Sequence, residues 1–509
     1  MAPVTCDAAA AVARIPDGAT VALTGSGGGI LEPDTLLSAL EQRFLDRGTP
    51  NGLTFLHAFG IGDRDRRGTN ALAHPGLTRR VIGGHWTWSP RMMELAAQSK
   101  IAAHVWPAGA ISLLLREIGG GRPGLITRTG LHTFADPRHG GGRANPAAEP
   151  DLVRLLELDG REFLHYQPIR VDIGLVRGTE VDPAGNIGCA EEPAILDVLA
   201  VAQAAKACGG TVIAQVKRRR DTPLDPRCVV LPAPLVDVIV EAPGQWQSYA
   251  AEHDPALSGL ADPPAPVELR QVDPVRAAIA RRAAREVSPG AVVNLGFGMS
   301  AQVADVLAEH GRLGEVTLAI EQGLFGGMPE SGDLFGLSRG ASARIASTTQ
   351  FDLFAGGLLD VCCLGMAEVD ASGSVNVSRF GDRIVGPGGF VDISQHARRA
   401  VFCGTFTARG LSAEVSDGSV RILREGGVRK FVQALQEITY SGPFAVAEGR
   451  EAVYVTERAV FRLGPDGLEL TEVADGISIE ADILAHMGFR PIIRSVRPMP
   501  AEVFRAASA

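Results

Sequence analysis

Several features that define other protein classes are scarce or missing in this chain of 509 residues. Aromatic residues make up 5%, only four of the 49 basic residues are lysines, and the formal net charge is −9. A negative chain is repelled by nucleic acid and by acidic membrane surfaces, so neither is an expected partner. No run of about 18 apolar residues occurs, so the sequence predicts no transmembrane helix.

Motifs for metal, disulfide and nucleotide sites are also missing. The seven cysteines form no Cys-x-x-Cys pair, so we expect neither a zinc site nor a disulfide framework. The sequences Gly-x-x-x-x-Gly-Lys-Ser/Thr and His-Glu-x-x-His do not occur. We therefore predict no metal and no resident cofactor. The N-terminus lacks a basic segment followed by a long apolar run, so we expect no signal peptide and, by elimination, a cytoplasmic protein.

What the chain has in excess is glycine, with 61 residues, well above the usual share of about 7%. The glycines follow short apolar runs that alternate with amphipathic helical segments. This alternation predicts βαβ units and mainly parallel sheets. Near the C-terminus, residues 452–470 read instead as antiparallel strands joined by a tight turn.

Two segments of the chain repeat the same order of elements. Residues 7–29 and 273–298 each read as helix, Pro/Gly turn, apolar strand and glycine loop. Asp172 and Asp360 each begin an apolar run that leads into a Val-Asp-x-x-Gly turn at the same offset. The sequence therefore predicts two tandem related open α/β domains. We place them at residues 1–262 and 274–509, with a proline-rich linker over 263–273.

Glu321 is the first candidate for chemistry. It follows the apolar run 316–320 directly and precedes a glycine-rich turn, so it is expected at the carboxyl end of a buried strand. Ligands bind at that edge of open α/β sheets. A surface carboxylate in a flexible turn is an equally good interpretation of this segment alone.

Three other segments have both a functional and a structural interpretation. The loop Gly386–Phe390 can present backbone N–H groups to an oxyanion, or can be a simple turn. His85 can be a general base, although packing at a strand end is favoured. The basic run Lys217–Arg220 can pair with cofactor phosphates, although a solvated strand end is favoured.

Taken together, these segments resemble the family I CoA-transferases, in particular the long single-chain acetate or propionate CoA-transferases and acyl-CoA:3-ketoacid transferases. The resemblance covers nearly the whole chain. It rests on VIGGHW at 81–86, GLHTFADPR at 130–138, VNLGFG at 293–298, EQGLFGG at 321–327, GPGGFVD at 386–392, FCGTF at 402–406 and MGFRP at 487–491.

The resemblance implies a NagB/RpiA/CoA-transferase-like fold with Glu321 as the catalytic nucleophile. It places Gly388 and Gly389 in an oxyanion and CoA-binding loop, and Asn294, Gly27 and Ala108 in the substrate pocket. The substrates would be an acyl-CoA and a carboxylic acid, which exchange CoA through a glutamyl-CoA thioester. A homo-oligomer, dimer or tetramer, is also implied.

Two positions depart from the family pattern. Ala108 and Glu368 stand where a glutamine is usual, which bears on the choice of acid. Two other functions stay open at this point. An acyl-CoA hydrolase would use the same glutamate but admit water, and a non-catalytic binding protein would turn over no acyl-CoA.

Overall fold

The computed structural model describes residues 3–149, 151–263, 270, 273–416 and 418–505. By their internal contacts these residues form two compact units. The first comprises the chain up to Pro263 with Ile320–Asp352 and Phe380–Asp392, and the second comprises Pro264–Ala319, Leu353–Arg379 and Ile393–Ala509. The predicted linker, residues 263–273, lies largely outside the described residues.

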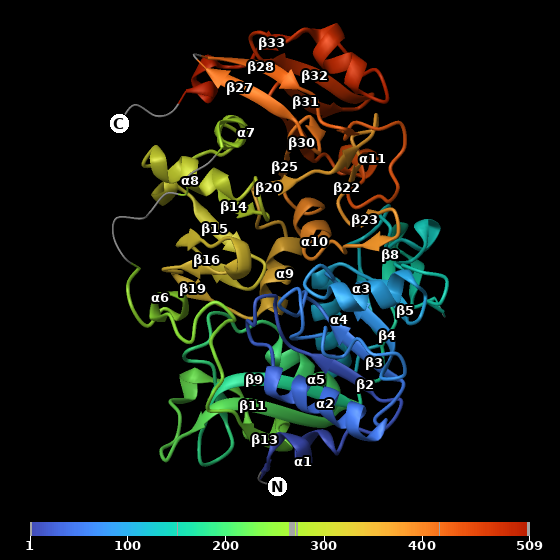
Figure 1. The fold of residues 1–509 in the computed structure, drawn as a ribbon, viewed down its shortest axis with the longest axis vertical. Helices are drawn as coiled ribbons and strands as arrows, with labels where there is room; N and C mark the ends of the chain where they lie inside the picture. The colour runs from blue at the N-terminus through green and yellow to red at the C-terminus, as the bar shows by residue number, and fades with distance from the viewer. Residues whose placement is uncertain (1–2, 150, 264–269, 271–272, 417, 506–509) are drawn as a thin grey trace. The chain divides into compact units, whose positions relative to one another are not determined.

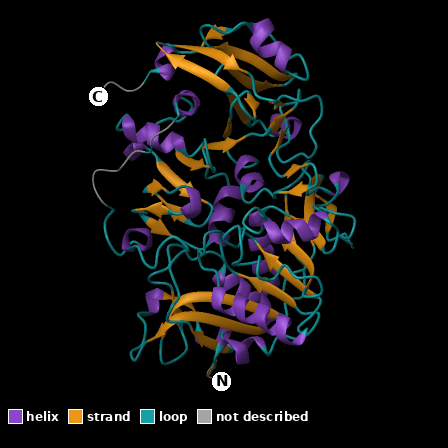
Figure 2. Cartoon of the chain, viewed as in Figure 1, coloured by secondary structure: helices purple, strands orange, loops and turns teal. Residues whose placement is uncertain are grey.

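The first unit is built on a mainly parallel sheet (Figures 1 and 2). Its strands, in sheet order, are β1 (Val4–Thr5), β13 (Val238–Glu241), β11 (Thr211–Arg219), β9 (Ile173–Val181), β2 (Thr20–Leu23), β3 (Leu53–His57), β4 (Thr78–Gly83) and β5 (Ala102–Val105). Every neighbouring pair along this path is parallel. Two short strands, β10 (Ile187–Gly188) and β12 (Val229–Leu231), add antiparallel pairs beside β9.

Helices of the first unit pack in pairs beside this sheet. The pair α1 (Ala8–Val12) and α2 (Asp34–Arg47) is in contact, as is the pair α4 (Ala108–Gly119) and α5 (Val198–Ala207). The remaining helices are α3 (Pro90–Ala97) and α6 (Pro255–Ser258). A separate antiparallel sheet holds β6 (Leu125–Thr127), β8 (Arg161–Tyr166) and β7 (Val153–Leu158). Strand β9 is buried along its whole length because it lies in the middle of the main sheet.

Short elements of residues 320–352 and 380–392 complete the first unit, and one of them begins at Arg379, the last residue of a second-unit segment. The antiparallel pairs are β16 (Leu324–Phe325) with β19 (Ala343–Arg344), β17 (Met328–Pro329) with β18 (Ser338–Arg339), and β23 (Arg379–Phe380) with β24 (Arg383–Ile384). Helices α9 (Ser347–Ala355) and α10 (Phe390–Ser394) each begin in the first unit and end in the second.

The second unit contains a sheet whose parallel part resembles the middle of the first sheet. Its strands, in order, are β15 (Thr317–Ile320), β14 (Val292–Leu295), β20 (Val361–Gly365), β25 (Arg399–Cys403), β30 (Glu451–Val455), β31 (Ala459–Gly464), β32 (Gly467–Val473) and β33 (Arg497–Pro498). The pairs from β15 to β30 are parallel, whereas β30, β31 and β32 pair antiparallel. The predicted antiparallel C-terminal strands are therefore confirmed.

Smaller elements surround this second sheet. They are α7 (Pro274–Ala284), α8 (Gln302–Glu309), α11 (Gly442–Ala447) and the short pairs β21 (Glu368–Val369) with β22 (Val375–Asn376), β26 (Thr407–Ala408) with β29 (Val428–Arg429), and β27 (Ser412–Ser416) with β28 (Ser419–Arg424). Helix α7 is capped by the Asp273 side chain, which accepts from the backbone N–H groups of Val275 and Arg276.

The two repeated aspartates make equivalent contacts in the two units. The Asp172 carboxylate accepts from the backbone N–H of Thr20 at 3.0 Å, and that of Asp360 accepts from Val292 at 2.9 Å. Each aspartate thus ties the start of its strand to the neighbouring strand, β2 in one unit and β14 in the other. The predicted fold class, two tandem related α/β domains with mainly parallel sheets, is confirmed.

Among the described residues, no helix is both long enough and apolar enough to cross a bilayer.

Candidate active site

Glu321 is the residue directly after β15, and a tight turn sets its direction. The backbone N–H of Gly323 donates to the Ile320 carbonyl at 2.9 Å, and Gly323 has a φ of +94°. A side chain at this glycine would place its Cβ 2.1 Å from the Ile345 carbonyl oxygen, so the turn requires glycine. The chain therefore reverses direction immediately after the carboxylate.

A second glycine loop, Gly386–Gly389, lies beside this carboxylate. The Gly388 backbone N–H donates to the Gly84 carbonyl at 2.8 Å, and the Ala108 N–H donates to the Gly388 carbonyl at 2.9 Å. A Cβ built on Gly388 would lie 4.0 Å from Glu321 Oε1 and 3.7 Å from His85 Cδ2. The space over Gly388 is therefore bordered by Glu321 and His85.

The carboxyl group of Glu321 is partly buried, and its surroundings alter its ionisation. Burial raises its pKa to about 7, while hydrogen bonds from the Gln322 side chain and the Gly389 backbone N–H act in the opposite direction. Burial, with smaller contributions from Arg64 and His57, lowers the pKa of His85 to about 4. At neutral pH the imidazole of His85 is therefore uncharged, and the Glu321 carboxyl group holds a proton more readily than an exposed glutamate does.

Asp392, three residues after the Gly386–Gly389 loop, joins it to helix α4. Its Oδ2 accepts from the Gly109 backbone N–H at 3.1 Å, at the start of α4. Its side chain is buried, and burial together with the nearby Glu321 charge holds its pKa well above the usual range. Asp392 thus connects the end of the Gly386–Gly389 loop to the helix that carries Ala108.

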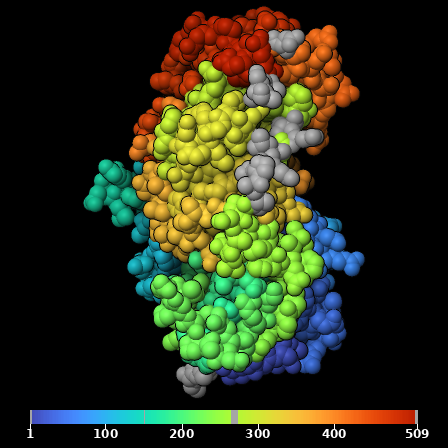
Figure 3. Space-filling view, turned by 90° about the vertical axis from the view of Figure 1, so that its left-hand side faces the viewer, coloured from blue at the N-terminus to red at the C-terminus, as the bar shows by residue number. Residues whose placement is uncertain are grey.

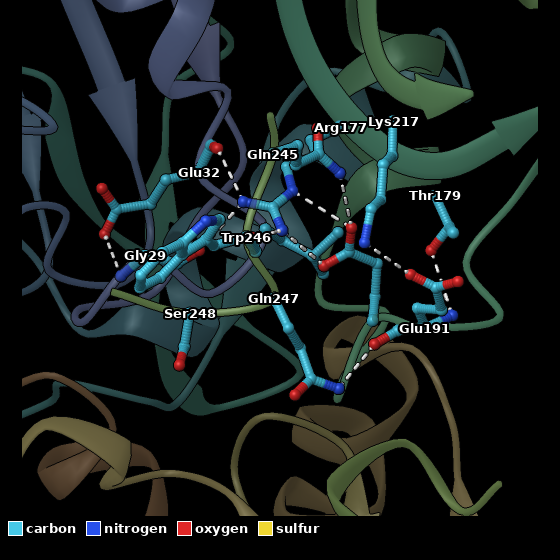
Figure 4. A network of polar contacts seen from close by, with 12 residues as sticks. Gly29, Glu32, Arg177, Thr179, Glu191, Lys217, Gln245, Trp246, Gln247 and Ser248 are labelled. Carbon is cyan, nitrogen blue, oxygen red and sulfur yellow. Dashed lines mark hydrogen bonds and ion pairs between the residues drawn. The ribbon is translucent and has the colours of Figure 1, made fainter. Parts of the chain in front are cut away.

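The first glycine loop, Gly25–Glu32, is held by a buried ionic network (Figure 4). Arg177 on β9 donates to the carbonyls of Gly29 and Glu32, both at 3.1 Å. Its guanidinium also makes two bonds to the Glu192 carboxylate, at 3.1 and 3.0 Å. Both side chains are at most 4% exposed, so this pair is almost free of solvent screening.

Further hydrogen bonds hold the Gly25–Glu32 loop in place. The Glu32 carboxylate accepts from the backbone N–H groups of Gly29 and Gly62, at 3.2 and 2.8 Å, and from the Tyr249 hydroxyl at 2.8 Å. The Tyr249 backbone N–H donates to the Gly28 carbonyl at 2.7 Å. Figure 3 shows surface atoms in the yellow-green colour of the residues that follow β13. The Gly25–Glu32 loop is therefore hydrogen-bonded both to Arg177 on β9 and to the segments that carry Gly62 and Tyr249.

The residues predicted for the substrate pocket have different surroundings. A Cβ on Gly27 would lie 2.0 Å from Trp88 Cε2, so the indole covers this glycine. Ala108 is fully buried at the start of α4. Asn294 belongs to the second unit, where its amide donates to the Ala319 carbonyl at 2.8 Å. In that unit Glu368 accepts from the Asn376 amide at 2.7 Å.

The basic run Lys217–Arg220 lies at the end of β11, and each of its side chains has an acidic partner. Lys217 and Arg218 pair with Glu191, Arg218 and Arg220 pair with Glu180, and Arg219 pairs with Glu241. These cations neutralise protein carboxylates, which favours the structural interpretation over phosphate binding.

The chain also contains a Gly-x-Ser-x-Gly spacing at residues 336–340, a pattern of serine hydrolases. Ser338 lies on the short strand β18, and its hydroxyl donates to the Gly326 carbonyl at 2.6 Å. A hydrolase nucleophile needs a strand-to-helix turn and an exposed hydroxyl. Ser338 has neither, so the spacing is structural here.

Sequence reasoning did not single out Ser26, Asp392 or Gln322, although the structure places all three around Glu321 or its glycine loop. The Gln322 amide nitrogen lies 3.5 Å from both Ser26 Oγ and Glu321 Oε1. No local pattern marks these residues, because each contact joins segments that are distant in the chain or depends on a side-chain direction.

Comparisons with known proteins show the family to which the chain is related. Residues 5–242 match the family model described as coenzyme A transferase. Acetate CoA-transferase YdiF of Escherichia coli K12 is 41% identical over 485 residues, which cover 95% of this chain and 91% of the relative. Caffeate CoA-transferase of Acetobacterium woodii is 40% identical over 489 residues, which cover 94% and 93%.

Solved structures extend the likeness to the fold. The apoenzyme of acyl-CoA transferase YdiF from E. coli O157:H7 matches with a TM-score of 0.94 at 40% identity, covering 99% of this chain and 96% of that one. Its thioester complex with CoA matches with a TM-score of 0.93 at 39% identity, with the same coverage. The chain belongs to the coenzyme A transferase family.

Proposed function

We propose that this CoA-transferase moves CoA from an acyl-CoA to a carboxylic acid by ping-pong chemistry, with Glu321 as the nucleophile. The observation that carries the proposal is the placement of the Glu321 carboxylate beside the Gly388–Gly389 loop, where a Cβ built on Gly388 would lie 4.0 Å from Glu321 Oε1. A carboxylate can act as a covalent catalyst, and backbone donors stabilise the oxyanion that forms.

The proposed reaction begins with attack of a Glu321 carboxylate oxygen on the thioester carbonyl carbon. The C–S bond breaks, CoA leaves as a thiolate, and an acyl–glutamyl anhydride remains. The thiolate then attacks the Glu321 carbonyl carbon, and the substrate acid leaves as a carboxylate. The resulting glutamyl-CoA thioester transfers CoA to a second acid by the reverse steps.

The related YdiF protein has been solved as a thioester complex with CoA, which supports this route for that protein. The acid that this chain uses is a separate question. Relatives are named for acetate and for caffeate, which differ greatly in size. Asn294, Gly27 and Ala108 stay predicted pocket residues. We also expect a homo-oligomer, dimer or tetramer, which sedimentation of the purified protein would establish.

The test is mass spectrometry of protein mixed with acetyl-CoA, with and without a panel of acids from acetate to cinnamates. We expect a CoA adduct on Glu321, and new CoA esters only when an acceptor acid is present. Glu321→Gln should fold, form no adduct and lose several orders of magnitude in rate. Transfer near the parent rate by this variant would refute the assignment.

The same experiment separates the alternative functions. Loss of acetyl-CoA without any acceptor acid would indicate a hydrolase. No turnover with any acid would indicate a binding protein. Mild heating adds a second readout, because the Glu321 backbone nitrogen can attack its own thioester carbonyl and expel CoA thiol. The product is an acylated pyroglutamyl ring, and water then hydrolyses the bond between Ile320 and residue 321. Two fragments should then appear only in protein that has been treated with acyl-CoA.

A further inference from the structure

The side chain of Gln322 is buried beside the Glu321 carboxylate, although the two residues are adjacent in the chain. It is 3% exposed, and its Nε2 lies 3.5 Å from Glu321 Oε1 and 3.5 Å from Ser26 Oγ. An amide NH₂ has two protons, so one is available for each acceptor. Both contacts are at the long end of the hydrogen-bond range, as catalytic contacts often are before substrate binds.

The orientation of this amide is determined by its neighbours. With the oxygen and nitrogen exchanged, Gln322 Oε1 would face the Glu321 carboxylate, and the two would repel. In the observed orientation Oε1 is buried and has no hydrogen-bond partner among the described residues. An unpaired buried acceptor is destabilising by about 1–3 kcal/mol. The orientation that directs the donor at Glu321 thus leaves the acceptor of the same amide unpaired.

The main chain around the amide leaves it little freedom. A Cβ on Gly336 would lie 2.6 Å from Gln322 Nε2, so this backbone approaches the amide as closely as only glycine allows. Gly336 also has a φ of +95°. From the other side, Ser26 belongs to the Gly25–Glu32 loop, which Arg177 and Glu32 hold in place (Figure 4). The acceptor that orients the amide is therefore itself fixed.

The proposed reaction includes a step in which the Gln322 amide could stabilise negative charge. When the CoA thiolate attacks the glutamyl anhydride, the C=O of Glu321 becomes a C–O⁻ in a tetrahedral intermediate. The negative charge then collapses, the C–O bond to the substrate acid breaks, and the acid leaves as a carboxylate. Donors already in place at the Glu321 oxygens stabilise this charge without reorganisation.

We propose that the Gln322 side-chain amide is a catalytic residue that, together with the Gly389 N–H, donates a hydrogen bond to the Glu321 carbonyl oxygen as it becomes an oxyanion. The inference rests on the proposed role of Glu321 and adds to it a side-chain donor, its orienting acceptor Ser26 and the network behind Ser26. Loss of a single oxyanion donor typically lowers kcat by about 10²–10³.

The experiment measures the rate of glutamyl-CoA formation by rapid mixing with acetyl-CoA, together with steady-state kcat and KM. Gln322→Leu should lower the adduct rate and kcat by about 10²–10³ with little change in KM, because the contact is made in the transition state. Gln322→Met, unbranched and similar in length, should show the same loss. Gln203→Leu on α5 is the matched control and should keep the parent rate.

Ser26→Ala tests the role of the Gln322 amide independently. It leaves Gln322 intact but removes one acceptor of its amide, so the adduct rate should fall by a smaller factor of about 2–10. A parent rate in either Gln322 variant, a change in KM alone, or a parent rate in Ser26→Ala would overturn the inference. In those cases the adduct on Glu321 would still form, so the proposed function would stand. Absence of the adduct in the parent protein would instead refute the proposed function.

Discussion

Replacing Arg177 by leucine should destabilise the first unit strongly. The change removes two bonds to Glu192 and the donors to the carbonyls of Gly29, Glu32 and Trp246. Glu192 would keep a bond from the Gln245 amide at 3.0 Å, but its buried charge would lose the cation that is hydrogen-bonded to it and keep only the weaker attraction of Arg344. Removing one residue of a buried ion pair lowers the free energy of unfolding by about 3–5 kcal/mol.

The assay is urea unfolding followed by circular dichroism, with the free energy of unfolding extrapolated to water. A matched control is Arg219→Leu on the next strand, β11, whose pair with Glu241 is more than a third exposed on both sides. Exposed pairs contribute about 0–1 kcal/mol, so the control should unfold almost as the parent does.

The double variant Arg177→Leu/Glu192→Leu checks the physical cause. It should be more stable than Arg177→Leu alone, because no unpaired charge is left in the interior. A loss below about 1 kcal/mol in Arg177→Leu would refute the reasoning. So would a double variant that is less stable than the single one, since the penalty would then lie in lost packing rather than in the charge of Glu192.

Three further predictions concern ionisation and packing near the site. Since the pKa of Glu321 is raised to about 7 and the carboxylate is the nucleophile, kcat/KM for adduct formation should increase about tenfold per pH unit up to about pH 7; a rate that is flat from pH 5 to 8 would contradict this. Burial raises the pKa of Glu32 to about 8, so its contribution to stability is present below about pH 4.5 and is lost as pH rises toward 8. Glu32→Gln should therefore flatten the pH profile of the unfolding free energy, and an unchanged slope would argue that Glu32 is ionised throughout. In Gly109→Ala the new Cβ would lie 2.2 Å from Asp392 Oδ1, so we expect about 1–3 kcal/mol of destabilisation and slower transfer. An unfolding free energy and a transfer rate equal to those of the parent would show that the start of α4 can shift to make room for the methyl group.

The sequence by itself determined the fold class and the position of the candidate nucleophile along the chain. Both depend on local regularities. The repeated Asp and Val-Asp-x-x-Gly pattern marks equivalent strands, and the structure shows Asp172 and Asp360 bonded to equivalent neighbours. Glu321 follows an apolar strand directly, and the end of a strand is visible in hydrophobicity alone. The antiparallel hairpin near the C-terminus followed from turn residues.

Only the tertiary structure decided what surrounds Glu321. Gln322 faces Ser26, which is 296 residues away, and Asp392 accepts from Gly109 across 283 residues. Such contacts depend on where strands and loops lie in space, and no spacing rule along the chain encodes them. The same holds for Gly27, where the sequence shows only a flexible loop and the structure shows the Trp88 indole against it. A glycine can make room for a ligand or for the protein itself, and only packing distinguishes the two.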